Sequence, residues 1–152
     1  MSVIAVRPAR ARKGDKNTSK LRRQSASRDG QTSMKNLRVM IIEDDNALAS
    51  ALAELIEILG HEVVAMEACE SGAIASATLA KPDLMIVDAH LVSGSGVAAV
   101  DAITRVGPVP HFFITGDMRS LRTLKPEAII LQKPYFDSDL IRAIALAVGR
   151  SY

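Results

Sequence analysis

The stretch "LRVMIIEDDN", residues 37–46, decides how the rest of the chain is interpreted. Its apolar run, residues 39–42, predicts a buried strand, and Asn46 opens a segment with apolar residues at helical spacing. Three acids, Glu43, Asp44 and Asp45, stand between the two. Acids in this place either cap the helix that follows or hold a cation.

The same order of strand and helix continues along the chain, and strict alternation predicts an α/β doubly wound parallel sheet with helices on both faces. We expect five strands in the order 2-1-3-4-5, the flavodoxin-like arrangement. The strands are predicted at residues 39–42, 62–66, 84–87, 111–115 and 128–131. Helices are predicted at residues 46–59, 71–80 and 97–106, and from Asp137 or Ser138 as the cap to about residue 148, while residues 117–127 fit either a short helix or a loop.

Length and composition are those of one globular domain of 152 residues. No apolar run approaches the roughly 18 residues that a membrane span needs, so we expect no membrane insertion. The single cysteine, Cys69, excludes an internal disulfide and a paired-cysteine zinc motif, which fits a reducing cytosol.

Charge divides the chain into a basic beginning and an acidic body. Residues 1–36 hold ten Lys or Arg and two Asp, a formal charge of +8, whereas residues 37–152 carry −6. We predict that residues 1–36 are a disordered extension and that residues 37–152 are the folded domain. The extension fits a nucleic-acid or membrane tether, a transit peptide or a solvated leader, and translation could also start at Met34. We expect nucleic-acid binding only through this extension.

Polar side chains follow four of the predicted strands. Asp44 and Asp45 follow the first, Asp88 the third, Thr115 ends the fourth and Lys133 comes just after the fifth. Because ligands of open parallel sheets bind beyond the carboxyl ends of the strands, these side chains are expected to converge. Each alone has an ordinary explanation, such as a helix cap or a solvated lysine, so the prediction depends on their conjunction.

Three carboxylates brought together repel one another unless a cation joins them. Their hard oxygen atoms suit Mg²⁺, which binds through one or two carboxylates, water and a phosphate oxygen. We therefore interpret Asp44 and Asp45 as metal ligands beside Asp88 rather than as helix caps.

These residues resemble the receiver domain of two-component response regulators over residues 37–150. The resemblance is carried by Asp44-Asp45, Asp88, Gly96, Thr115 and Lys133-Pro134. It implies that Asp88 accepts a phosphoryl group from a sensor histidine kinase or a phosphotransfer protein. It also implies that the Lys133–Pro134 peptide bond is cis.

The resemblance further implies a Mg²⁺ site formed by Asp45 as a direct ligand, Asp44 nearby or through water, Asp88 and the backbone carbonyl of His90. The phosphoryl group is expected to contact the Thr115 hydroxyl and the Lys133 ammonium. The backbone N–H groups of Ala89 and Gly116 are expected as additional donors.

The chain departs from the common receiver pattern at three positions. Val92 stands where proline is frequent, Gly116 follows the threonine in place of alanine, and Ile130 replaces the aromatic residue that often switches. The stretch Phe113–Gly116 is similar to a receiver subgroup nicknamed FAT GUY, although Asp117 departs from it.

The chain is thus expected to be a stand-alone response regulator rather than an enzyme, with at most slow self-dephosphorylation. It would signal by phosphorylation-dependent binding of an unidentified target or by phosphorelay. The altered switch positions leave a second interpretation open, a pseudo-receiver adaptor that is not phosphorylated. A small phosphatase with an aspartate nucleophile fits less well, because it requires Asp-x-Asp after the first strand, where this chain has Asp44, Asp45 and Asn46.

Overall fold

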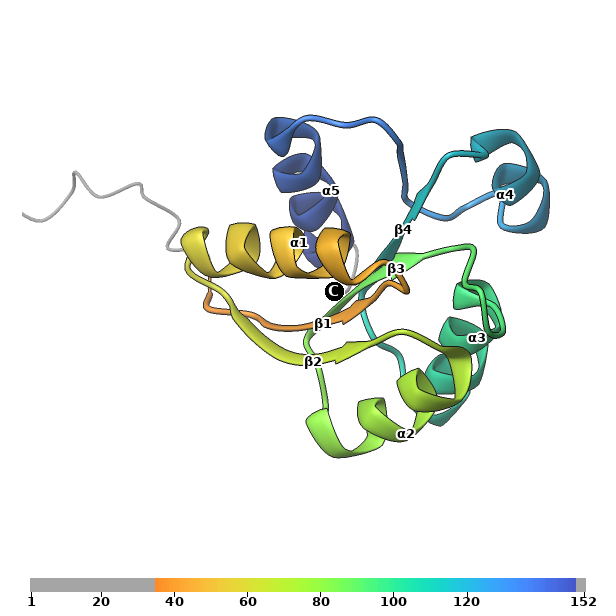
Figure 1. Cartoon of the computed structure of the whole chain (residues 1–152), viewed down its shortest axis with the longest axis horizontal. Helices are drawn as coiled ribbons and strands as arrows, with labels where there is room; N and C mark the ends of the chain where they lie inside the picture. Colours follow the sequence, from red (N-terminus) through yellow and green to blue (C-terminus); the bar gives the residue numbers. More distant parts are fainter. Residues whose placement is uncertain (1–34, 150–152) are drawn as a thin grey trace, which may run out of the picture. The chain divides into compact units, whose positions relative to one another are not determined.

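A computed structural model describes residues 35–149, which form five strands and five helices in strict alternation (Figure 1). The strands are β1 (Arg38–Ile42), β2 (Glu62–Glu67), β3 (Leu84–Asp88), β4 (His111–Thr115) and β5 (Ile130–Gln132). The helices are α1 (Asn46–Ile58), α2 (Glu70–Ala80), α3 (Gly96–Val106), α4 (Met118–Leu124) and α5 (Asp137–Gly149).

All strands run parallel in the order β2-β1-β3-β4-β5, which confirms the predicted doubly wound sheet. β1 and β3 are neighbours, and Ile42 lies opposite Val87. The residues that follow these two strands therefore leave the sheet at the same edge. This register brings the first acids close to Asp88.

Each face of the sheet is covered by its own helices (Figure 1). α1 and α5 pack on one face against alternate strand residues such as Ile41, Ile86 and Phe112. α2 and α3 pack on the other face against the intervening residues, including Met40 and Phe113. Because the side chains of a strand alternate between faces, a strand covered on both sides must be apolar throughout. The continuous apolar runs in the sequence follow from this arrangement.

Local signals in the sequence account for the ends of the first two helices. α1 ends at Ile58, and Gly60 follows with a φ of +88°, a left-handed conformation that glycine adopts without steric cost. α2 ends at Ala80, where Lys81 adopts a left-handed φ of 47° before Pro82. Both ends agree with the positions predicted from Gly60 and from Lys81-Pro82.

The last third of the chain differs from its prediction at two places. β5 begins at Ile130, two residues after the predicted start, because residues 125–128 form a turn closed by the bond from the Ala128 N–H to the Lys125 carbonyl. Arg122 also donates to the carbonyls of Pro126 and Ala128. α5 begins at Asp137, so neither Asp137 nor Ser138 is its cap. The carboxylate of Asp139 instead accepts the backbone N–H of Phe136, just before the helix.

The undecided stretch 117–127 contains a helix of seven residues, α4, which ends before Pro126. Leu121 is the one residue of α4 that is buried. A short helix with one apolar anchor is weakly held by packing alone. Within residues 35–149 no helix has both the length and the apolar character needed to cross a membrane.

Candidate functional site

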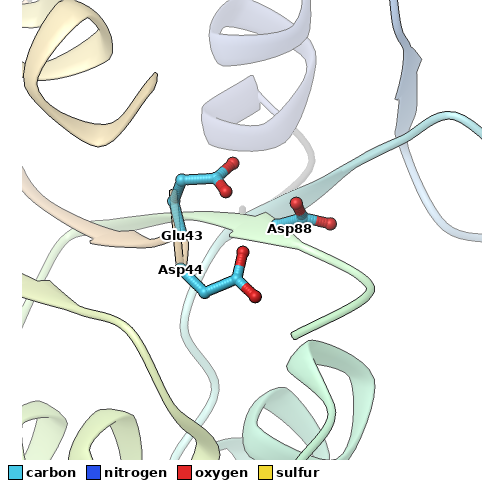
Figure 2. Close-up of side chains that lie close together, drawn as sticks. All are labelled: Glu43, Asp44 and Asp88. Carbon is cyan, nitrogen blue, oxygen red and sulfur yellow. The ribbon is translucent and has the colours of Figure 1, made fainter. Parts of the chain in front are cut away.

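Three carboxylates meet at the ends of β1 and β3 (Figure 2). Each of Glu43, Asp44 and Asp88 offers an oxygen atom, and these oxygen atoms lie within 4.8 Å of one another. Figure 2 shows the carboxylates of Glu43 and Asp44 turned toward the end of β3, where Asp88 lies. Glu43 and Asp88 are only 7% and 8% exposed, and Asp44 is half-buried.

Asp45 does not join this cluster. It is the N-cap of α1, and its Oδ1 accepts the backbone N–H groups of Ala47 at 2.9 Å and Leu48 at 3.1 Å. The interpretation of Asp44 and Asp45 as metal ligands rather than caps is therefore wrong for Asp45. Capping satisfies backbone donors that the first turn of a helix leaves without partners.

Glu43 is the residue that the sequence interpretation missed. A signal for it was present, because an N-cap stands immediately before the first helical residue. The helix was expected to begin at Asn46, so Asp45 was its cap by position. The two acids left for the site are then Glu43 and Asp44, one residue earlier than the predicted pair.

Lys133 supplies a positive charge to the cluster. Its Nζ lies 3.0 Å from Asp88 Oδ2 and 3.5 Å from Glu43 Oε2. Partial burial lowers the pKa of Lys133, but the hydrogen bond to Asp88 and the charges of Asp88 and Glu43 outweigh it and raise the pKa above the usual lysine value. The Lys133–Pro134 peptide bond is cis, in agreement with the expectation.

The pKa of Glu43 reflects its burial beside another carboxylate. Burial raises the pKa of Glu43, and the charge of Asp88 raises it further, while the backbone N–H of Asp45 and the charge of Lys133 oppose the rise. With all groups charged, one ammonium faces three carboxylates, a formal surplus of −2. Such a surplus of hard oxygen donors fits a divalent cation such as Mg²⁺.

Thr115 is the last residue of β4. It is 1% exposed, and its Oγ1 accepts the backbone N–H of Asp117 at 3.0 Å and lies 3.5 Å from His90 Nδ1. The backbone N–H of Lys133 donates to the Thr115 carbonyl at 2.8 Å. The structure thus brings Thr115 next to the chain segment that carries Lys133.

The backbone N–H that faces the Asp88 carboxylate belongs to His90. It donates to Asp88 Oδ1 at 2.9 Å. Ala89 was predicted as a donor to the phosphoryl group, but its N–H donates to the carbonyl of Ile114 at 3.1 Å and so continues the pairing of β3 with β4. The roles of the Gly116 N–H and the His90 carbonyl stay predictions.

The loop between β3 and α3 approaches the cluster closely. The backbone N–H of Val92 donates to Asp44 Oδ2 at 2.6 Å. At the start of α3, a Cβ added to Gly96 would lie 1.9 Å from the backbone oxygen of Asp88. Glycine is therefore required at position 96 by the close approach of α3 to the end of β3.

Comparisons with known proteins agree with this geometry. The Response regulator receiver domain profile matches residues 39–145. The transcriptional regulatory protein PdtaR from Mycobacterium tuberculosis is 35% identical over 117 residues, which cover 74% of this chain and 57% of PdtaR. The phyllosphere-induced regulator PhyR from Methylorubrum extorquens is 33% identical over 114 residues, which cover 72% of this chain and 43% of PhyR.

A solved structure shares the fold as well as the sequence. The NMR structure of the Erythrobacter litoralis PhyR response regulator REC domain matches with a TM-score of 0.69 and 31% identity, over 75% of this chain and 91% of that chain. The chain spans about half the length of the curated relatives it matches.

The profile match begins in β1 and ends within α5, so it includes all five strands and every residue of the carboxylate cluster. Because the match covers this whole extent, the chain belongs to the family of response regulator receiver domains.

Proposed function

We propose that this receiver domain accepts a phosphoryl group on Asp88 from the phosphohistidine of a sensor histidine kinase or a phosphotransfer protein in the bacterial cytoplasm. The observation that carries the proposal is the position of Asp88. Asp88 is the last residue of the central strand β3. Its carboxylate lies within the carboxylate cluster and accepts a hydrogen bond from the ammonium group of Lys133 at 3.0 Å.

In the proposed reaction an oxygen of Asp88 attacks the phosphorus atom. The O–P bond forms while the P–N bond to the donor imidazole breaks, and the electron pair of that bond stays on the imidazole nitrogen. Phosphoryl transfer depends mainly on positioning and charge stabilisation. Lys133 holds Asp88 from one side and the N–H of His90 holds it from the other.

The phosphoryl oxygens need hydrogen-bond donors around Asp88. The Lys133 ammonium, the Thr115 hydroxyl and the backbone N–H groups of His90 and Gly116 are the proposed donors. The N–H of His90 takes the place that was first expected for Ala89, because it already donates to the Asp88 carboxylate.

The same residues fit a Mg²⁺ ion. Glu43, Asp44 and Asp88 would hold it, together with the His90 carbonyl. When bound, Mg²⁺ neutralises negative charge on the cluster and on the incoming phosphoryl oxygens. The support is the donor set itself, three oxygen ligands within 4.8 Å with a surplus of negative charge.

We propose that phosphorylation changes binding of a protein target, or that the phosphoryl group is relayed onward. Thr115 and Lys133 flank the segment 116–132, which includes α4 and β5. Contacts of both residues with one phosphoryl group would pull on both ends of this segment. The subgroup resemblance at Phe113–Gly116 stays a prediction.

A pseudo-receiver adaptor is the second candidate. It is favoured by Ile130, which stands at the usual aromatic switch position and packs partly buried in the core beneath α2 and α3. An adaptor of this kind would bind its partner without phosphorylation, so the two candidates differ in one measurement.

That measurement is phosphoryl transfer to the full chain with Mg²⁺, from acetyl phosphate or from a phosphorylated kinase. The wild type and Asp137→Asn, an exposed aspartate change on α5, are expected to gain one phosphoryl group by intact mass. Asp88→Asn is expected to gain none. Equal labelling of Asp88→Asn would place the phosphoryl group elsewhere, and no labelling of the wild type by any donor would favour the adaptor.

A further inference from the structure

Glu70 connects two parts of the domain that are distant in sequence. It is the half-buried first residue of α2, and it lies beside the loop of residues 89–95, which joins β3 to α3. Its Oε2 accepts the backbone N–H of Ser95 at 2.9 Å, and its own backbone N–H donates to the carbonyl of Ser93 at 3.2 Å. Glu70 therefore binds the β3–α3 loop through both its side chain and its backbone.

The loop backbone between these two bonds approaches Glu70 closely. A Cβ added to Gly94 would lie 2.4 Å from Glu70 Cβ and 2.6 Å from Glu70 Oε2. Ser95 is the N-cap of α3, and its side chain accepts the N–H of Ala98 at 3.3 Å. The contact with Glu70 thus fixes the end of the loop at the point where α3 begins.

The same loop also reaches the carboxylate cluster. The backbone N–H of Val92 donates to Asp44 Oδ2 at 2.6 Å, a short distance that is expected when the acceptor is charged. The bond uses one of the two carboxylate oxygens of Asp44. A hydrogen bond to a metal-binding carboxylate fixes its orientation, so the ligand does not have to be ordered when the ion binds. The orientation of Asp44 therefore depends on where the loop holds the Val92 N–H.

We propose that Glu70 is a positioning residue for the site. It holds the β3–α3 loop in the place from which the Val92 N–H donates to Asp44, and it thereby favours binding of Mg²⁺ by the cluster. Glu70 acts through the loop, because its own carboxylate binds the Ser95 N–H. This inference deepens the proposed function and rests on its Mg²⁺ site, but not on phosphorylation of Asp88.

The first test is calorimetric Mg²⁺ titration of variants of the full chain. Glu70→Ala removes the acceptor, whereas Glu70→Gln removes the charge but keeps an oxygen that accepts the Ser95 N–H. Glu70→Ala is expected to bind Mg²⁺ roughly three- to tenfold more weakly than the wild type. This is less than the loss of about 10–100-fold that is typical when a direct partner of a ligand is removed, because the Val92 N–H itself remains. Glu70→Gln is expected to stay within about twofold of the wild type.

Asp83→Ala is the matched control. Asp83 is also half-buried, and its Oδ2 accepts the backbone N–H of Arg38 at 2.9 Å. It lies just before β3, at the amino ends of the strands, whereas the cluster lies at their carboxyl ends. Asp83→Ala thus removes the same charge and the same kind of bond, and its Mg²⁺ affinity should stay within about twofold of the wild type. The proposal is overturned if Glu70→Ala loses no affinity, or if Glu70→Gln or Asp83→Ala loses as much.

A second measurement separates positioning from a general loss of stability. The Val92 amide proton, followed by NMR without Mg²⁺, is expected to shift upfield and to exchange faster in Glu70→Ala than in the wild type, but not in Asp83→Ala. An unchanged Val92 resonance in Glu70→Ala would also overturn the proposal. This readout needs neither Mg²⁺ nor phosphoryl transfer. A wild type that failed to bind Mg²⁺ would refute the proposed metal site, while the amide would still decide whether Glu70 positions the loop, so the two failures are distinguishable.

Discussion

The ammonium nitrogen of Lys133 lies between two buried carboxylates, 3.0 Å from Asp88 and 3.5 Å from Glu43, although 45 residues separate Lys133 from Asp88. This contact joins the end of the central strand β3 to the loop after the edge strand β5. The positive charge of Lys133 thus balances part of the negative charge of the carboxylates at the site that we propose for phosphoryl transfer.

Lys133→Met is expected to reduce phosphoryl transfer from acetyl phosphate by at least tenfold, because it removes the cation that faces the developing charge on the phosphoryl oxygens. Mg²⁺ binding should persist, since the carboxylates remain. Lys125→Met is the matched control, because Lys125 also pairs with an aspartate, Asp101 at 2.6 Å, but belongs to a different part of the domain. Equal rates for both variants would exclude a role of Lys133 in the transfer.

Asp45→Ala is expected to reduce the free energy of unfolding by about 0.5–2 kcal/mol, because it removes the N-cap of α1. Its Mg²⁺ affinity should stay close to that of the wild type. Asp44→Ala should show the opposite pattern. It should bind Mg²⁺ weakly, and its free energy of unfolding should change little, because the N-cap of α1 remains. Urea unfolding and calorimetric Mg²⁺ titration of both variants check this, with Asp45→Ser as a control that restores a capping oxygen. Loss of Mg²⁺ affinity in Asp45→Ala would return Asp45 to the ligand set.

The folded domain is expected to lose stability at mildly acidic pH because of the buried side chain of His61. Its ring is buried, its Nδ1 accepts the N–H of Leu37 at 3.4 Å, and burial lowers the pKa of His61. The unfolded chain therefore binds a proton more readily than the folded chain, so stability falls as pH drops below the ordinary histidine value of about 6.5. Above that value both states are neutral and His61 adds no pH dependence.

His61→Asn keeps an acceptor oxygen near Leu37 and cannot titrate in this range. Its unfolding free energy should fall less steeply between pH 7 and pH 5 than that of the wild type, measured by urea denaturation. His111→Asn controls for the loss of a partly buried histidine elsewhere. Parallel curves for the wild type and His61→Asn would contradict the prediction.

Gly96→Ala is expected to destabilise the domain by about 1–3 kcal/mol, because its methyl group would lie 1.9 Å from the backbone oxygen of Asp88 and force α3 away from β3. Phosphoryl transfer to Asp88 should fall as well, since the same backbone carries the acceptor. Gly107→Ala is the control, because an added Cβ there meets no atom within 4 Å. Thermal unfolding of both variants gives the comparison, and equal midpoints would show that α3 can shift at no cost.

The segment 116–130 is expected to gain the most protection from amide hydrogen exchange when Mg²⁺ and beryllofluoride bind. In the present structure Thr115 Oγ1 accepts the N–H of Asp117, which begins the turn into α4, and α4 has the single buried anchor Leu121. Drawing Thr115 toward a phosphoryl group changes that bond at the start of a weakly packed helix. Protection concentrated on residues 46–59 instead would place the switch in α1.

The sequence by itself determined the order of the strands and of every helix except α4, because each of these elements carries a local signal. Apolar runs marked strands that are covered on both faces, and Gly60 and Lys81-Pro82 marked helix ends. The positions of Asp88, Thr115 and Lys133 at the carboxyl edge followed from the same alternation, since parallel strands end at one edge. Residues 1–34 lie outside the described residues, so the predicted extension stays a prediction.

The position of Asp45 directly before α1 marks it as the cap, but only the tertiary structure shows that Glu43 and Asp44 lie beside Asp88. In sequence Glu43, Asp44 and Asp45 are adjacent and chemically similar, and their roles depend on where β1 ends and α1 begins. The register between β1 and β3 directs Glu43 and Asp44 toward Asp88, while the first turn of α1 takes Asp45 as its cap. A shift of one residue exchanges these roles, and a linear pattern of charges does not carry the side-chain directions that make the difference.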